Sequence, residues 1–546
     1  GDITVEASYS GVVTQNKNLS VFNNYHQYGG TFLCSAPQTY TLSVGRDFSI
    51  PTTEGSFLRY SGDGTSESTA YGIYDVFGLQ AANSNVTKNF KLMRPIDAST
   101  TRYWNWNGVT YEGFRSIGDI FEFSGTPRYF AGRFDGQGKV ISNLYSHRTD
   151  TMSNGLFGVA SGSTITDLGL SNVHISGKGF VSGLLAYAAA CNISGCYVTG
   201  YISSEPVTFY ISTFEVGIGS SGGLVSLGIG CNISNCYSSG EISNTGYSEF
   251  FIFEPLSGGL LALGSEAQIL NCYSTALLTS VPAGSGGLIG TLSSGVISNS
   301  YFTDSSHDNT LGELKTFDEL KRKSTFVDWD FDDTWSMDEG INIPYFLWEI
   351  WNWDGGAGTG TWTNSENWTR KSGWPLLPTD KVYINYGNQT ISTPTTTLTL
   401  GSLKLGSSFE GIVNLRNDLL LTPEARSGEL AILNGSLSTG AYRVRLSGDF
   451  VVKAPGQFVR DSNNGSITFA DTRLISSIYG DNSFYDFICT TPGKILSFEA
   501  GFVQTVEGTF RLSGEAGNNI VLRSLSDGEN GMCIRPGPEK RRISWT

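Results

Sequence analysis

The chain has 546 residues, of which 68 are glycine and only 16% are charged. Its formal net charge of −15 at pH 7 excludes a general nucleic-acid-binding role, and its 39% apolar content excludes a disordered chain. The sequence holds no run of about 18 apolar residues, so we expect no membrane span. Because Ser, Thr, Asn and Gly separate short apolar runs, the composition predicts an all-β protein with many tight turns.

The chain begins with Gly1 in the strand-like stretch GDITVEAS, which indicates a processed or trimmed piece of a longer polypeptide. The stretches YTLSVGRDFSIPT (40–52) and YGIYDVFGLQAANSNVTKNFKL (71–92) resemble segments of large passengers of the filamentous-haemagglutinin type. This resemblance implies an N-terminal β-solenoid segment over residues 1–89.

A repeat organises the middle of the chain. Five motifs of the type GLFG, GLLA, GLVS or GLIG begin at Gly155, Gly183, Gly223, Gly259 and Gly287. A second marker (TITDLGL, NISGCYV, NISNCYS, QILNCYS, VISNSYF) supplies Ile165, Ile193, Ile233, Ile269 and Ile297. Both sets have spacings of 28, 40, 36 and 28 residues, which indicates a 28-residue unit with two insertions. The insertions fall near VTFYISTFEVGI (207–218) and SEFFIFEP (248–255), and we expect them to form loops on one side of a solenoid.

A helix-free unit of this length is typical of one coil of a right-handed parallel β-helix, in which equivalent residues stack into ladders. The repeated isoleucines should form an inward ladder. Asp167, Asn235, Asn271 and Asn299, interrupted by Gly195, should form a ladder of turns in which side-chain amides bind backbone groups. We expect Tyr197, Tyr237, Tyr273 and Tyr301 to stack on the outside.

The repeat and its flanks resemble the GLUG-motif repeats of bacterial surface and secreted proteins. The lead-in consists of FKLMRPIDAS (90–99), GFRSIG (113–118) and FAGRFDGQGKVISNLYS (130–146), and the exit is FDELKRKSTFVDWDFDDTWSMDEGINIPYFLWE (317–349). The resemblance implies a GLUG-repeat β-helix with an exit cap over residues 90–350. Thr316 and Glu319 form a capping box that predicts one short helix near 316–323. From WNWDGGAGTGTWTN onward, residues 351–546 are interpreted as a second β-solenoid region that continues beyond the fragment.

The eight cysteines admit three interpretations. They are Cys34, Cys191, Cys196, Cys231, Cys236, Cys272, Cys489 and Cys533. In the repeat, their positions alternate with Leu, Ser, Ala and Gly, which favours small buried fillers of the core. A cross-coil disulfide such as Cys191–Cys231 and a metal site remain as alternatives.

An acidic run in the exit segment offers oxygen ligands. It consists of Asp328, Asp330, Asp332, Asp333, Asp338 and Glu339. The run lacks the spacing of an EF-hand, and the neighbouring Trp329, Phe331 and Trp335 indicate an aromatic cap on the coil. The structural cap is favoured over a calcium site.

Some parallel β-helix proteins are polysaccharide lyases or glycosidases, so one group of charged residues is a candidate active site. It comprises Arg128, Arg133, Asp135 and Lys139, but FDGQG within it is typical of a turn. The four histidines (His26, His147, His174 and His307) fall outside any nucleophile motif. The sequence therefore predicts no catalytic, cofactor-binding or metal-binding residues and no enzyme activity.

Aromatic residues outside the ladders fit sugar stacking and solenoid junctions equally well. They are Trp104, Trp106, the aromatics of the two insertions, Trp351, Trp353, Trp362, Trp368 and Trp374. The favoured function is a structural or adhesive protein of the bacterial cell surface, built as a rigid β-solenoid rod. Its expected partners are surface glycans or another cell-surface protein, with homo-oligomeric or fibre assembly. The alternatives are a carbohydrate-active β-helix enzyme and a glycan-binding module without turnover.

Overall fold

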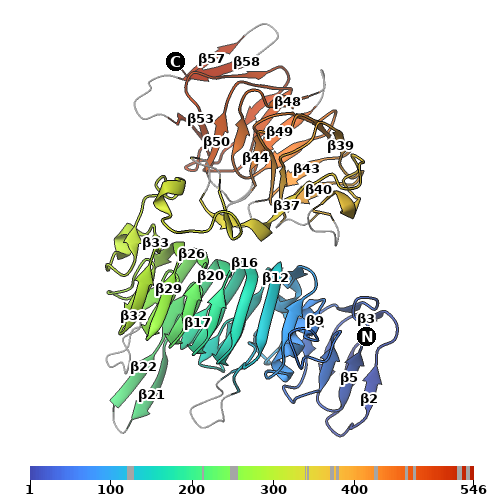
Figure 1. Ribbon diagram of the computed structural model, residues 1–546, viewed down its shortest axis with the longest axis vertical. Helices are drawn as coiled ribbons and strands as arrows, with labels where there is room; N and C mark the ends of the chain where they lie inside the picture. The colour runs from blue at the N-terminus through green and yellow to red at the C-terminus, as the bar shows by residue number, and fades with distance from the viewer. Residues whose placement is uncertain are drawn as a thin grey trace. The chain divides into compact units, whose positions relative to one another are not determined.

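The computed structural model describes residues 1–119, 128–211, 214–245, 256–337, 340, 343–368, 374–376, 380–422, 428–460, 465–470, 475–525, 532–536 and 541–545. The chain divides into two compact units, Gly1–Leu347 and Trp348–Thr546. Each unit is built from short strands that pair in parallel with strands of the next coil (Figure 1). The predicted parallel β-helix is confirmed, and its right-handed sense stays a prediction. Among the described residues, no helix is both long and apolar enough to cross a membrane.

The first coils of unit 1 form three narrow sheets. Their strands are β1 (Ile3–Val5), β4 (Tyr25–Gln27) and β7 (Phe48–Ser49); β2 (Val12–Thr14), β5 (Thr31–Cys34) and β8 (Phe57–Arg59); and β3 (Leu19–Val21) and β6 (Leu42–Val44). Alternate side chains of these strands enter the core because successive residues of a strand point to opposite faces. The rings of Phe32 and Phe57 stack there with centroids 4.5 Å apart. β9 (Tyr71–Ile73) pairs with β10 (Phe90–Leu92), so the predicted segments 1–89 and 90–350 share one sheet.

The described residues contain one α-helix, α1 (Val76–Ala81), which the sequence analysis did not predict. Asp75 caps it by accepting a 2.9 Å hydrogen bond from the Gly78 N–H. The other carboxylate oxygen of Asp75 accepts two hydrogen bonds from the fully buried Arg59, at 2.6 and 2.8 Å. This pair fixes the start of the helix against the N-terminal coils.

The helix expected near 316–323 is not formed. The capping box is present, because the Thr316 N–H donates to Glu319 Oε2 (2.7 Å) and the Glu319 N–H donates to Thr316 Oγ1 (3.2 Å). Only turns follow, and then the short 3-10 helix η4 (Lys323–Thr325). Leu320 is the buried side chain of residues 316–323, so the segment lacks the apolar face that stabilises a short helix. The other 3-10 helices are η1 (Ala82–Ser84), η2 (Ser99–Tyr103), η3 (Ser305–His307), η5 (Leu347–Glu349) and η6 (Ser365–Asn367).

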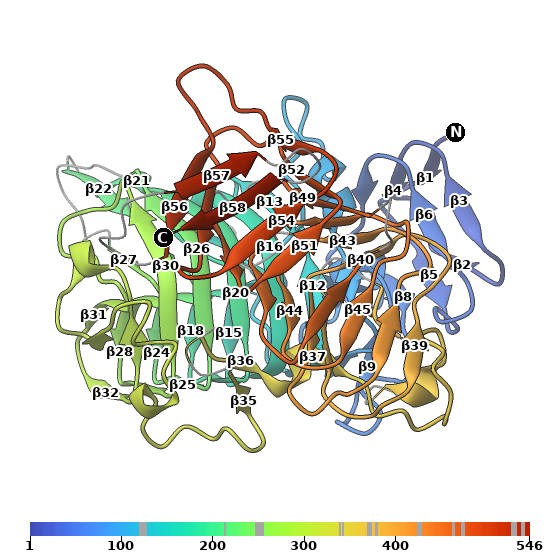
Figure 2. The ribbon, with the colours of Figure 1, turned by 90° about the horizontal axis from the view of Figure 1, so that it is seen from above.

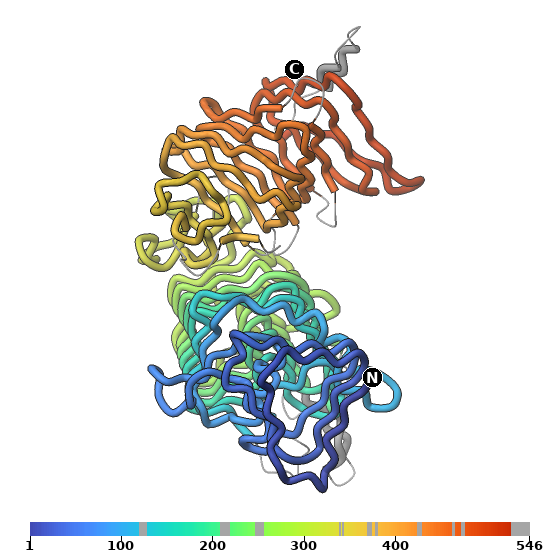
Figure 3. Tube along the Cα trace, turned by 90° about the vertical axis from the view of Figure 1, so that its right-hand side faces the viewer, coloured from blue at the N-terminus to red at the C-terminus, as the bar shows by residue number. Residues whose placement is uncertain are grey.

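The repeat forms the stacked coils at the centre of unit 1, which Figure 3 shows nearly end-on. One sheet contains β15 (Phe157–Ser161), β18 (Leu185–Ala189), β24 (Val225–Ile229), β28 (Leu261–Ser265) and β31 (Ile289–Leu292), several of them side by side in Figure 2. A small sheet contains β14 (Ser153–Asn154), β17 (Phe180–Ser182), β23 (Ser220–Gly222) and β27 (Ser257–Gly258).

The large sheet of unit 1 bends around a corner of each coil. Besides β9 and β10 it contains β11 (Ile96–Asp97), β12 (Arg133–Ser142), β13 (Tyr145–Arg148), β16 (Thr164–Lys178), β19 (Asn192–Ser194), β20 (Tyr197–Glu205), β25 (Asn232–Ser234), β26 (Tyr237–Asn244), β29 (Ala267–Leu270), β30 (Tyr273–Thr279), β32 (Gly295–Ser298), β33 (Tyr301–Phe302) and β34 (Glu313–Leu314). The predicted isoleucine ladder is confirmed, because all five isoleucines are paired in register from Ile165 to Ile297.

The corner of each coil is a turn in the left-handed backbone region. Asp167, Gly195, Asn235, Asn271 and Asn299 have φ values of 52°, 62°, 48°, 53° and 47°. Asn, Asp and Gly tolerate this conformation best, which explains why Gly replaces Asn once. Backbone N–H groups of the turns donate to the next coil, from Asn235 to Leu270 O at 2.9 Å and from Asn271 to Ser298 O at 3.2 Å. Left-handed backbone geometry, more than the amide hydrogen bonds we expected, thus selects the residues of this ladder.

The tyrosine ladder lies outside the core, as predicted, but it is covered. Neighbouring rings from Tyr197 to Tyr237 and from Tyr237 to Tyr273 stack with centroids 4.8 and 4.9 Å apart. All four tyrosines, including Tyr301, are at most 6% exposed. Aromatic residues of the exit segment lie over them, including those of β35 (Trp335–Ser336) and β36 (Tyr345–Phe346). We call the described residues 326–337, 340 and 343–346 the strap.

The first insertion forms an antiparallel hairpin of β21 (Val207–Ile211) and β22 (Phe214–Ile218), which projects from the stack in Figure 1. This agrees with the expected loop on one side of the solenoid. The second insertion, predicted near 248–255, lies outside the described residues.

Unit 2 is a second parallel solenoid. Its sheets contain β37 (Ile350–Asn352), β38 (Lys381–Ile384), β41 (Ser402–Leu405), β44 (Leu430–Ile432), β47 (Phe450–Val452), β50 (Ile475–Tyr479), β53 (Ile495–Phe498) and β56 (Val521–Ser524); β39 (Thr390–Ser392), β42 (Ile412–Asn414), β45 (Ser436–Ser438) and β48 (Gln457–Val459); and β40 (Leu398–Leu400), β43 (Leu419–Leu421), β46 (Val444–Leu446), β49 (Ser466–Phe469), β52 (Asp486–Cys489) and β55 (Phe510–Leu512). A fourth sheet joins β51 (Asn482–Phe484), β54 (Val503–Val506), β58 (Arg541–Trp545) and β57 (Met532–Pro536), with antiparallel pairing around β58.

Candidate functional site

The cysteines of the repeat form two columns inside the coils. Cys191 lies beside Cys231 in one column, and Cys196, Cys236 and Cys272 form the other; all five are buried. The seven cysteines with described side chains are free thiols. Burial raises the pKa of Cys236, which keeps that thiol protonated. These columns fit the small-filler interpretation, and the side chain of Cys533 lies outside the described residues.

The acidic run builds turns of the strap. One oxygen of Asp330 accepts the N–H groups of Asp332 and Asp333, each at 3.0 Å, and the other accepts the Thr334 hydroxyl at 2.9 Å. These hydrogen bonds lower the pKa of Asp330. Asp338 and Glu339 lie outside the described residues. Within the described part of the chain, no three His, Cys, Asp or Glu side chains gather in a way that would hold a metal ion.

The aromatic cap predicted from the exit segment covers a side of the coils. Trp329 and Trp335 lie along the lateral face of the coils, where they pack on Tyr273 with ring centroids 6.2 and 6.1 Å away. The Trp329 indole donates to Asn299 O at 3.0 Å, and the Trp335 indole donates to Asn235 Oδ1 at 3.4 Å. The cap therefore buries the tyrosine ladder of the repeat.

The charged residues considered as a candidate active site bind different partners. Arg133 Nη1 lies 3.8 Å from Glu67 Oε1, and Lys139 Nζ donates to Gln137 O at 3.1 Å. Asp135 accepts the Gln137 N–H at 2.8 Å, which is the turn chemistry expected of FDGQG. Burial, followed by repulsion from Asp135, raises the pKa of Asp167 on the next coil. The structure thus brings two carboxylates near each other, a pair that the sequence analysis did not identify.

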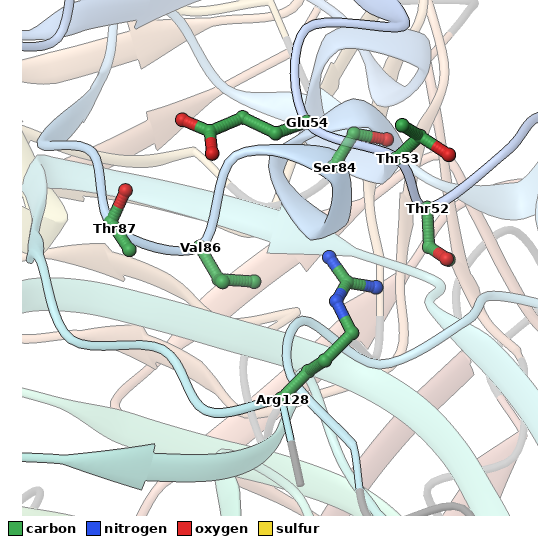
Figure 4. Close-up of a pocket in the computed structure, with 7 residues that line it drawn as sticks. All are labelled: Thr52, Thr53, Glu54, Ser84, Val86, Thr87 and Arg128. Atoms are coloured by element: carbon green, nitrogen blue, oxygen red, sulfur yellow. The ribbon is translucent and has the colours of Figure 1, made fainter. Parts of the chain in front are cut away.

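Arg128 lines a separate pocket of about 330 Å³ in unit 1, shown in Figure 4. Its other lining residues are Thr52, Thr53, Glu54, Ser84, Val86 and Thr87. Arg128 donates to the Asn83 carbonyl oxygen, and the Ser84 hydroxyl donates to Pro51 O at 2.7 Å. Arg128 and Ser84 thus bind carbonyl oxygens of the protein itself, and Glu54 lies close enough to Arg128 to act on its charge.

Most tryptophans weighed as sugar platforms are packing residues. Trp104, Trp362 and Trp368 are fully buried, and Trp351 and Trp353 are at most 6% exposed. The tryptophans of unit 2 pack edge to face; for example, the ring centroids of Trp353 and Trp368 are 4.9 Å apart. The partly buried Trp374 packs against the same core. Trp106, which is 49% exposed in unit 1, keeps an open ring surface.

A polar and aromatic strip on the large sheet was not identified from the sequence. Tyr145, His174 and Tyr201 are cross-strand neighbours, with ring centroids 5.5 and 4.9 Å apart and nearly parallel planes. The guanidinium carbon of Arg102 lies 5.6 Å from the centroid of Tyr145. Burial, then the electrostatic influence of the neighbouring Arg102 and His147, lower the pKa of His174. The strip was missed because Tyr145 and His147 precede the first recognised repeat copy.

The structure defines the class of the chain as a parallel β-helix protein, and comparisons with known proteins add limited detail. No protein-family model matches the chain. It is 31% identical over 209 residues to halomucin from Haloquadratum walsbyi, a match that spans 35% of this chain and 2% of halomucin. A crystal structure of a provisionally named immunoglobulin A1 protease from Bacteroides ovatus aligns with 53% of this chain and 95% of its own, at 19% identity and a TM-score of 0.33. A similarity at that score carries no argument about fold or activity.

Proposed function

We propose that the chain is a non-enzymatic, extracellular structural and adhesive protein of the cell surface, of the bacterial GLUG-repeat type. The observation that carries this proposal is the in-register stacking of coils from Ile165 to Ile297, with an insertion that projects as a hairpin. Such a stack is stiff because every coil is hydrogen-bonded to its neighbours, and projecting loops supply contact surface. Expected partners are surface glycans or another surface protein, and the coil stack also suits fibre assembly.

The partial match supports an extracellular place for the chain, since halomucin is by its name a mucin and mucins are extracellular. The separate contacts of Arg133 with Glu67, and of Asp135 and Lys139 within their own turn, support a role without turnover. A glycan-binding module is the second candidate, and the exposed strip around His174 is the observation that favours it.

The test is to display the full chain on a non-adherent bacterial host and to measure adhesion to glycan-coated and protein-coated surfaces. Adhesion above that of the empty host is expected. Reducing-sugar and unsaturated-product assays on the purified chain should show no turnover of the same glycans. Turnover would contradict the proposed function, and so would the absence of adhesion to every surface when the chain is correctly displayed.

A further inference from the structure

We propose that unit 1 binds a neutral, extended glycan along the coil axis, on a surface that we call the outer strip. The outer strip consists of Tyr145, His147, His174, Ser176, Tyr201 and Ser203, carried by β13, β16 and β20. This inference rests on the proposed adhesive function and names the class of its ligand.

The first row of the outer strip presents ring edges. Tyr145, His174 and Tyr201 contact one another through their faces, with interplanar angles of 12° and 25°. Arg102 covers the free face of Tyr145 at one end. Because His174 lies between two rings and Tyr145 lies between His174 and Arg102, these two side chains offer a ligand mainly their ring edges, with an imidazole nitrogen and a phenol hydroxyl. The hydroxyl of Tyr201 lies 3.3 Å from Ser243 Oγ, so it adds to the hydroxyl groups of the neighbouring row. His174 is exposed, and Tyr145 and Tyr201 are half-buried.

The second row adds small hydroxyl groups in the same register. His147 Nδ1 lies 2.8 Å from Ser176 Oγ, and one strand further on Ser243 Oγ donates to Ser203 Oγ at 2.9 Å. Coils repeat at the strand spacing of about 4.8 Å, so donors and acceptors recur along the axis at a constant interval. A polysaccharide repeats its hydroxyls in the same way, whereas a protein interface is centred on a few anchor residues and has no such repeat.

The outer strip has defined borders on its strands. On β20 the covered Tyr197 precedes Tyr201 by four residues, so the strap marks one border of the strip. The projecting hairpin begins at Val207, directly after the end of the same strand, and marks the other border. The exposed surface between these borders runs across successive coils, which suits a chain-like ligand.

A loop beside Arg102 supplies the aromatic faces that the outer strip lacks. Tyr103 and Trp106 are 52% and 49% exposed. The loop is held in place because Asn107 Oδ1 accepts the N–H groups of Val109 and Thr110, each at 2.9 Å. A pre-organised ring costs little entropy on binding, so this loop would stack on the sugar at one end of the bound chain.

The charges around the outer strip favour a neutral ligand. Arg102 lies beside Tyr145 at one end of the outer strip, and Glu241, the cross-strand neighbour of Tyr201, lies at the other end. At the far end of the same strands, Lys178 is the cross-strand neighbour of Glu205. The lowered pKa of His174 favours the uncharged form of its imidazole. Arg102 and Lys178 are thus matched in number by Glu241 and Glu205, so the surface offers no net charge of one sign to a sulfated or uronic-acid polymer.

The experiment uses the full chain and two conservative variants. His174→Phe with Tyr201→Phe keeps the stacked rings and removes their polar edges, so the coils should remain intact. Tyr187→Phe is the matched control, since Tyr187 is a half-buried tyrosine on β18 of the same coil. Binding is measured by calorimetry to linear β-glucan, galactan and mannan as neutral probes, and to pectate and heparin as acidic probes. We expect the double variant to bind its neutral glycan about tenfold more weakly and the control to bind normally.

The outcomes separate this inference from the proposed function. Normal binding by the double variant would overturn the outer strip as the site and leave the adhesive function standing. Binding to acidic probes alone would overturn the neutral ligand. Adhesion to cells or proteins without binding to any of the five glycans would overturn the inference while supporting the proposed function.

Discussion

The strap should detach from the coils when Trp335 is replaced by alanine. Trp335 is fully buried, and its ring lies 4.3 Å from Phe346 and 4.5 Å from Trp329 between centroids. A buried tryptophan removes about 200 Å² from water, which is worth about 5 kcal/mol at about 25 cal/mol per Å². Substitutions of this kind cost about 3–5 kcal/mol, and the indole hydrogen bond to Asn235 is also lost. We therefore expect strap docking to weaken by about 4 kcal/mol.

The assay is limited proteolysis of the native chain with chymotrypsin, followed by mass spectrometry of the cut sites. Phe326 and Trp329 are buried, so cleavage after them requires an open strap. A loss of about 4 kcal/mol should raise that cleavage rate by two to three orders of magnitude if opening is fast. Trp106→Ala is the control, because Trp106 is 49% exposed and should cost less than about 1 kcal/mol. Unchanged cleavage at the strap aromatics in the Trp335 variant would refute the reasoning.

Three further changes test other parts of unit 1. Arg59→Met should lower the free energy of unfolding by about 3–5 kcal/mol, since it leaves the helix-capping Asp75 without its buried partner; the measurement is a urea titration followed by circular dichroism. Asn271→Gly should be nearly neutral, whereas Asn271→Val should cost about 2 kcal/mol, because φ at this turn is 53°. Asp167→Asn should stabilise the chain by about 0.5 kcal/mol at pH 7, since burial and repulsion from Asp135 disfavour the carboxylate. That advantage should shrink towards pH 3, where Asp167 is protonated, and an equal shift in melting temperature at both pH values would contradict it.

The sequence alone predicted the structural features that depend on the repeat period. The spacing of 28, 40, 36 and 28 residues placed Ile165 and Ile297 in one ladder, and the Asn and Gly choice at the corner followed from the same register. Periodicity encodes contacts between equivalent residues of adjacent coils. It therefore identifies the core, the turns and the position of the insertions.

Contacts between non-equivalent parts of the chain carried no such signal. The strap residue Trp335 binds Asn235, which is 100 residues earlier, so the tyrosine ladder could be assigned to the outside but not recognised as covered. The helix α1 has only six residues, and it depends on Arg59 for the position of its cap. Conversely, the capping box at Thr316 is real, but a cap without an apolar face did not produce a helix. The outer strip was missed because it begins on β13, before the first repeat copy.

The strap also changes how the coils of unit 1 can come apart. Successive aromatics along the strap contact tyrosines of successively earlier coils. Phe326 contacts Tyr301, and Trp335 contacts Tyr273 and Tyr237. Phe346, at the end of the strap, contacts Tyr197. A simple stack frays one coil at a time from its end, because each coil is held only by its neighbour. Here the last coil is followed by a segment fastened to the coils before it, so peeling it away requires releasing several rungs together. A pulling force that enters from the C-terminal side therefore meets the contact of Phe346 with Tyr197 before it reaches the last coil.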